Sequence, residues 1–200
     1  MRRITYLGVI NVTPNSFSDG HLNQTSDFQN SQLHKFHSNN YQIDIGAEST
    51  APFNDPVGFD EEWDRLESYI EHHMDMLVSF QTISIDTYRP RTISSFMSKY
   101  ANVFEDVIWN DVSGIVDTQT IAVLEKFSRL RYVLCHNLAP ERIETTNHMD
   151  YTRNDLSVID LKNFFEAAIK KLRDLGISPE RIILDPCFGF SKSYDQNISL

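Results

Sequence analysis

Short apolar runs rich in β-branched residues alternate with longer stretches along this chain. Runs of this kind, bounded by polar or turn-forming residues, are typical of strands. They predict six strands: residues 5–11, 42–46 and 82–86, a fourth that ends at residue 110, a fifth that ends at residue 136, and residues 181–185.

The stretches between these runs carry apolar residues at the three- and four-residue spacing of a helix. Helices are predicted at residues 60–80 and 157–175, and weaker signals cover 27–37, a segment that begins near Pro90, and 118–127. Gly176 stands where the C-cap of the 157–175 helix is expected. His72 and His73 are expected on the surface of their helix, and residues 186–200 are expected to contain no helix.

Strands that alternate with helices predict an α/β fold with a parallel sheet and right-handed crossovers. Two architectures fit this order. One is a TIM (β/α)8-type barrel, of which the chain would hold only about the first six βα units, because a complete barrel needs about 250 residues. The other is a complete, open, doubly wound sheet of six strands. No GxGxxG follows the first strand, which weakens the second architecture.

Each predicted strand runs into a polar residue within one or two positions of its end. Barrel enzymes build their active sites from groups at the carboxyl ends of successive strands. The repetition therefore predicts one shared site, formed by Asn11, Glu48, Asp86, Asn110, His136 and Asp185.

Composition and net charge exclude several classes of protein and of binding partner. The chain has 200 residues, so we expect one domain over residues 1–200. No apolar stretch is long enough for a membrane span, and the N-terminus leads directly into a strand, so we expect a cytoplasmic protein. The net charge of −10 argues against nucleic acid and membranes as partners. Cys135 and Cys187 are expected to be packing residues, with neither a disulfide framework nor a zinc site.

Two loops carry the most distinctive strings. Asn11-Val-Thr-Pro-Asn-Ser-Phe-Ser-Asp-Gly20 follows the first strand, and such polar loops at strand ends commonly act as lids. Phe17 is an apolar group within it that could close over a flat substrate. The string Asp44-Ile-Gly-Ala-Glu-Ser-Thr-Ala-Pro52 follows the second strand and offers backbone N–H groups and hydroxyls for phosphate oxygens.

With Ile85-Asp-Thr87, Trp109-Asn-Asp-Val-Ser-Gly114 and Leu184-Asp-Pro-Cys-Phe-Gly-Phe-Ser-Lys192, these strings closely resemble dihydropteroate synthase, from residue 4 to the last residue. The resemblance implies a pterin-binding TIM barrel, incomplete at the C-terminus. It also implies a transferase of folate biosynthesis that joins (7,8-dihydropterin-6-yl)methyl diphosphate to 4-aminobenzoate, giving dihydropteroate and diphosphate. The alternative is a non-catalytic or degenerate pterin-binding remnant of that enzyme.

The resemblance also implies roles for individual residues. Catalytic roles fall to Asn11, Thr13 and Phe17, and Asn11 would also hold the cofactor Mg²⁺. The predicted substrate-binding residues are Thr50, Asp86, Asn110, Asp185, Phe190 and Lys192. The implied partners are the two small-molecule substrates, with a homodimer if the C-terminal units are present.

The chain departs from the family pattern at several positions. Ala51 stands where the family has an arginine that would contact diphosphate, and Cys187 and Ser191 replace glycines. The family's Ser-Arg-Lys and Arg-x-His segments do not occur in these 200 residues, which leaves Lys192 and Arg89 as the cations expected near the site. We therefore do not expect the 200 residues alone to be active.

Overall fold

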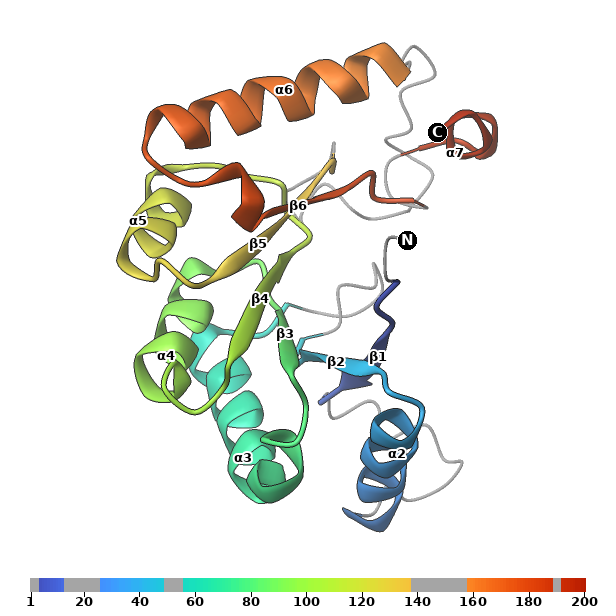
Figure 1. Ribbon diagram of the computed structural model, residues 1–200, viewed down its shortest axis with the longest axis vertical. Helices are drawn as coiled ribbons and strands as arrows, with labels where there is room; N and C mark the ends of the chain where they lie inside the picture. The colour runs from blue at the N-terminus through green and yellow to red at the C-terminus, as the bar shows by residue number, and fades with distance from the viewer. Residues whose placement is uncertain (1–3, 13–25, 49–55, 138–157, 189–191) are drawn as a thin grey trace. The chain divides into compact units, whose positions relative to one another are not determined.

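The computed structural model describes residues 4–12, 26–48, 56–137, 158–188 and 192–200. Six strands alternate with helices along these segments (Figure 1), and they form one sheet with the order β1-β2-β3-β4-β5-β6. The registers for β1 with β2, β2 with β3, and β5 with β6 are all parallel. The strands are β1 (Leu7–Asn11), β2 (Gln42–Gly46), β3 (Thr82–Asp86), β4 (Asp106–Asp111), β5 (Arg131–Cys135) and β6 (Ile182–Asp185).

All five predicted helices are present, with ends within three residues of those predicted. They are α2 (Ser26–Ser38), α3 (Phe59–Leu77), α4 (Pro90–Tyr100), α5 (Thr118–Lys126) and α6 (Val158–Asp174). A 3-10 turn, η2 (Pro179–Arg181), leads into β6, and a short helix, α7 (Tyr194–Ser199), follows it. Within the described segments, no helix has the length and apolarity needed to cross a membrane.

The chain divides into two compact units. The first comprises residues 1–49 and 57–108, and its sheet core is β2 and β3. Ile43, Ile45, Ile83 and Ile85 are almost completely buried there. Every residue of β2 is buried, as expected for a strand covered on both faces.

Helix α3 shows how the sequence pattern produces this packing. Its inward stripe includes Leu66, Ile70 and Leu77, which recur at helical spacing and are fully buried. Acidic residues occupy its first turn, where they complement the positive end of the helix dipole. In Figure 1, α3 and α4 lie side by side, and Pro90 opens α4 at a position where its missing N–H costs nothing.

The second unit comprises residues 50–56 and 109–200. Its largest buried side chains are Trp109 and Tyr132, whose rings lie 5.0 Å apart on neighbouring strands. Arg181, just before β6, donates to the carbonyl oxygens of Leu130, Leu124 and Phe127 at 2.9 Å each. These bonds hold the start of β6 against the end of α5 and the turn before β5.

Two expectations were wrong. Residues 186–200 do contain a helix, α7, because Ser193 and Gln196 form a capping box that satisfies the first backbone N–H groups. His73 is buried rather than exposed, because its ring nitrogens meet the side-chain oxygens of Asn30 and Gln29 at 3.0 and 3.4 Å. This contact joins α3 to α2, whose own apolar face is thin.

Gly114 occupies a position that no other residue fits. Its φ is +66°, and a Cβ there would lie 2.1 Å from the carbonyl oxygen of Cys135. Gly176 also has a positive φ, of +83°, but a Cβ there would meet nothing within 4 Å. Gly176→Ala therefore isolates the backbone cost, about 1–2 kcal/mol.

We expect Gly114→Ala to lower the free energy of unfolding by a further ~1–3 kcal/mol, because the added methyl group must displace a strand backbone. Denaturant unfolding of the two variants and the parent chain measures both the backbone cost and the additional cost of the close approach at Gly114. Equal losses in the two variants would contradict the close approach at Gly114.

Candidate active site

In the first unit, three strand ends lie side by side. Asn11 pairs in register with Gly46, and Gly46 pairs with Asp86. Residues in register on neighbouring parallel strands point to the same face, so Asn11 and Asp86 flank a position that has no side chain. A Cβ on Gly46 would lie 3.2 Å from Asp86 Oδ2, so the Asp86 carboxylate leans over the glycine. Asn11 is exposed and Asp86 is half-buried.

A buried charge network lies beyond the ends of β2 and β3. The Arg89 guanidinium donates to the carboxylates of Glu48 and Glu62, with its Nη1 3.0 Å from Glu62 Oε2. Both carboxylates are almost fully buried. Arg89, which the sequence suggested as a cation near the site, is therefore engaged by two acidic partners. It acts as a structural group, tying the β2 loop to α3.

In the second unit, β4 ends in Asn110 and Asp111. Asn110 is half-buried, and Asp111 is buried with its Oδ1 accepting from Ser113 N at 2.8 Å and its Oδ2 from the Tyr132 hydroxyl at 2.8 Å. Burial raises the pKa of Asp111 to about 6, against the opposing effect of these hydrogen bonds. Asp111 thus anchors the turn after β4.

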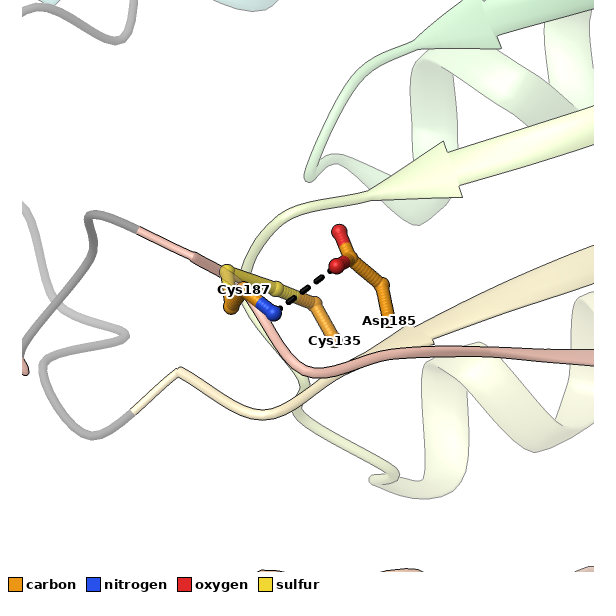
Figure 2. Close-up of side chains that lie close together, drawn as sticks. All are labelled: Cys135, Asp185 and Cys187. Atoms are coloured by element: carbon orange, nitrogen blue, oxygen red, sulfur yellow. Dashed lines mark hydrogen bonds between the residues drawn. A yellow bond between two sulfur atoms is a disulfide. The ribbon is translucent and has the colours of Figure 1, made fainter. Parts of the chain in front are cut away.

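Asp185 closes β6 and pairs in register with Cys135 at the end of β5. Its Oδ1 accepts from the backbone N–H of Cys187 at 2.8 Å, and its other oxygen turns away from that contact (Figure 2). Cys135 and Cys187 form a disulfide, with their Cα atoms 5.7 Å apart. The expectation of two unpaired packing cysteines was therefore wrong. The fold brings together two residues that are 52 positions apart in the sequence, which spacing alone does not reveal.

Lys192 is buried against the same strand ends. Its Nζ donates to the carbonyl oxygens of His136 at 2.8 Å and Cys187 at 3.3 Å. Burial lowers the pKa of Lys192 to about 8, and the charge of Asp185 opposes that change. Burial, followed by the charge of Lys192, lowers the pKa of His136 to about 4. At neutral pH the site therefore holds a lysine cation beside a neutral histidine.

The remaining predicted site residues, Thr13, Phe17, Thr50 and Phe190, lie outside the described residues, as does Ala51. Sequence reasoning missed Gly46, which makes room for Asp86, and Glu62, which holds Arg89. For Gly46, a glycine at the end of a strand is a usable signal. The second carries no local signal, because an acidic residue in the first turn of a helix is common on surfaces.

Comparison with known proteins shows the family to which this chain belongs. The family model described as "Pterin binding enzyme" matches residues 7–200. The dihydropteroate synthase of Synechocystis sp. is 31% identical over 204 residues, which cover 100% of this chain and 65% of that protein. The chain therefore spans about two thirds of the length of this relative.

Two solved structures are similar in fold. A dihydropteroate synthase from Clostridium difficile, determined in the presence of pteroic acid, has 31% sequence identity and a TM-score of 0.74, covering 97% of this chain and 68% of that one. The Xanthomonas albilineans enzyme with 4-aminobenzoic acid has 27% identity and a TM-score of 0.74, covering 98% and 66%. This likeness confirms the predicted α/β fold of the TIM-barrel type, with six of its βα units in the chain. The chain belongs to the pterin binding enzyme family.

Proposed function

We propose that this chain is the pterin-binding part of a dihydropteroate synthase. The observation that carries the proposal is a match to such an enzyme along the entire chain, combined with carboxylates at the ends of β3 and β6. The reaction joins (7,8-dihydropterin-6-yl)methyl diphosphate to 4-aminobenzoate. This reaction belongs to folate biosynthesis. The proposal includes the cytoplasmic location that the sequence leads us to expect.

On the basis of the family resemblance, we assign recognition of the pterin to Asp86, Asn110 and Asp185. A pterin is a flat ring edged with amine and amide N–H donors, which carboxylate and amide oxygens can accept. The Asp185 carboxylate is already oriented by the Cys187 N–H, so a ring donor meets a preformed acceptor. A ring that lacked those donors would leave half-buried oxygens unpaired, which favours pterins over other flat molecules.

Asn11 suits a role in holding Mg²⁺ with the diphosphate. Magnesium is bound through one or two protein oxygens plus substrate phosphates, and it keeps several waters. Asn11 is an exposed residue that pairs in register with Gly46, and its carboxamide oxygen is the kind of ligand that this ion binds. The ion, when bound, would neutralise charge on the diphosphate oxygens.

The proposed reaction needs little acid–base catalysis from the residues of this chain. The bond between the pterin methylene carbon and the diphosphate oxygen breaks, and the amine nitrogen of 4-aminobenzoate forms the new C–N bond and loses a proton. Lys192 supplies positive charge near the pterin, and the half-buried carboxylates hold the ring while the leaving group departs. Thr13, Phe17, Thr50 and Phe190 complete the proposed site through the roles implied by resemblance. The proposed homodimer also rests on resemblance alone.

The test is formation of dihydropteroate from the two substrates in the presence of Mg²⁺. The chain is assayed alone and joined to the last two βα units of the Synechocystis enzyme, and product is identified by mass. We expect product from the joined protein and none from the chain alone. Omitting either substrate, or chelating Mg²⁺, should abolish the product signal.

Each other outcome selects a different function. Pterin binding without any product in the joined protein would favour a non-catalytic pterin-binding remnant. Absence of both binding and product would overturn the proposal. Turnover by the 200 residues alone would show that the arginine, histidine and lysine of the family's later segments are not required.

A further inference from the structure

The disulfide between Cys135 and Cys187 lies directly beside the proposed pterin carboxylate. Figure 2 shows the sulfur–sulfur bond and the Asp185 side chain within the same small cluster, at the ends of β5 and β6. The sulfur atoms and a carboxylate oxygen all lie within 4.8 Å of one another. Breaking the bond between Cys135 and Cys187 would therefore change the surroundings of the Asp185 carboxylate.

Cys187 contributes its backbone as well as its sulfur. Its N–H donates to Asp185 Oδ1 at 2.8 Å, and its carbonyl oxygen accepts from Lys192 Nζ at 3.3 Å. Cys187 thus orients the Asp185 carboxylate through its N–H and accepts a hydrogen bond from the Lys192 ammonium through its carbonyl oxygen. Both groups are assigned to substrate binding in the proposed function.

The conformation of Cys187 is one that a cysteine rarely adopts without a constraint. Its φ is +59°, in the left-handed region, which costs a residue with a Cβ roughly 1–2 kcal/mol. The disulfide fixes Cys187 to the end of β5, because Cys135 pairs in register with Asp185 on the neighbouring strand. With the bond broken, nothing covalent opposes relaxation of Cys187 away from that conformation.

We propose that the Cys135–Cys187 pair is a redox-sensitive element that sets the pterin affinity of the site through the orientation of Asp185. The oxidised pair holds the Cys187 N–H on the carboxylate, and the reduced pair releases it. The inference rests on the proposed function, since it takes Asp185 as a pterin ligand. A disulfide in a protein of a reducing compartment is usually transient, catalytic or redox-sensing, which fits this role.

The chemical step is thiol–disulfide exchange with a dithiol. One thiolate of the dithiol attacks a sulfur of the pair and forms a mixed disulfide. The second thiol of the dithiol then attacks the mixed disulfide, releases the cysteine thiol and leaves the dithiol as an internal disulfide. Two electrons and two protons pass to the pair, which becomes two thiols. Cys135 and Cys187 are only 1% and 3% exposed, so exchange requires local opening. Bound pterin should therefore slow the reduction.

The experiment compares oxidised and dithiothreitol-reduced forms of the 200-residue chain. Thiol counts before and after treatment establish the two states, and calorimetry measures the affinity for 6-hydroxymethylpterin in each. We expect affinity to fall about tenfold on reduction, the size of one lost charge-assisted hydrogen bond. Hydrogen exchange at the Cys187 amide provides a readout without ligand, and we expect faster exchange in the reduced form.

Cys135→Ser is the matched variant, because it keeps Cys187 and its backbone N–H but cannot form the bond. It should match the reduced parent chain under both conditions. Equal pterin affinity in the oxidised and reduced parent, with unchanged exchange at Cys187, would overturn the inference and leave the proposed function standing. Faster exchange at Cys187 with no pterin binding in either state would instead refute the proposed function.

Discussion

Replacing Glu62 with alanine is expected to lower the free energy of unfolding by about 3–5 kcal/mol, the cost of removing one partner of a buried ion pair. The Glu62 side chain is 1% exposed. It accepts from the hydroxyls of Thr87 at 2.6 Å and Thr92 at 2.5 Å, and from Arg89 Nη1 at 3.0 Å. Alanine would leave two buried hydroxyls without this acceptor and Arg89 with one carboxylate fewer.

Glu61→Ala is the matched control, since the two residues are neighbours in the first turn of α3. The Glu61 side chain is 57% exposed and pairs with Arg65 one helical turn along α3. Exposed pairs of this kind contribute roughly 0.2–1 kcal/mol. Urea unfolding of both variants, followed by circular dichroism, measures the difference. Similar losses in the two variants would show that the Glu62 network does not stabilise the first unit.

The order of elements could be predicted because each one rests on a local pattern. The runs before Asn11, Asp86 and Asp185 contain apolar β-branched residues, and each ends at a polar residue, so the strand ends were predicted closely. Helix α3 followed from apolar residues at helical spacing. Helix α7 was missed because six residues carry little periodicity, and its stability depends on the reciprocal capping bonds of Ser193 and Gln196.

The site itself was predictable only in part. Asp86 and Asp185 could be singled out because strand-end carboxylates are few and follow an apolar run. Their environment could not, because it depends on contacts between distant segments. The bond from Cys135 to Cys187 spans 52 positions, and Arg89 meets Glu48 across 41. No pattern within either segment signals such a partner.

Asp185→Asn is expected to weaken pterin binding by about 10- to 100-fold, the equivalent of about 1.5–3 kcal/mol for a hydrogen bond to a charged group. Asparagine keeps an oxygen that can accept from the Cys187 N–H, so the strand end should retain its conformation. What the variant loses is the negative charge that faces the ring donors. Thermal unfolding should therefore change little while affinity changes greatly.

Asp174→Asn provides the control, because Asp174 lies at the end of α6 with its side chain 53% exposed and paired with Lys170. It removes the same charge from the same unit at a position with no proposed ligand. Any general effect of net charge on an electron-rich pterin should appear equally in both variants.

Calorimetric titration of 6-hydroxymethylpterin into the oxidised parent chain, Asp185→Asn and Asp174→Asn tests most directly whether a strand-end carboxylate binds the pterin. The account predicts saturable one-site binding to the parent and to Asp174→Asn with equal affinity, and binding at least about tenfold weaker to Asp185→Asn. Equal affinity in all three proteins, or no binding to the folded parent, would contradict it.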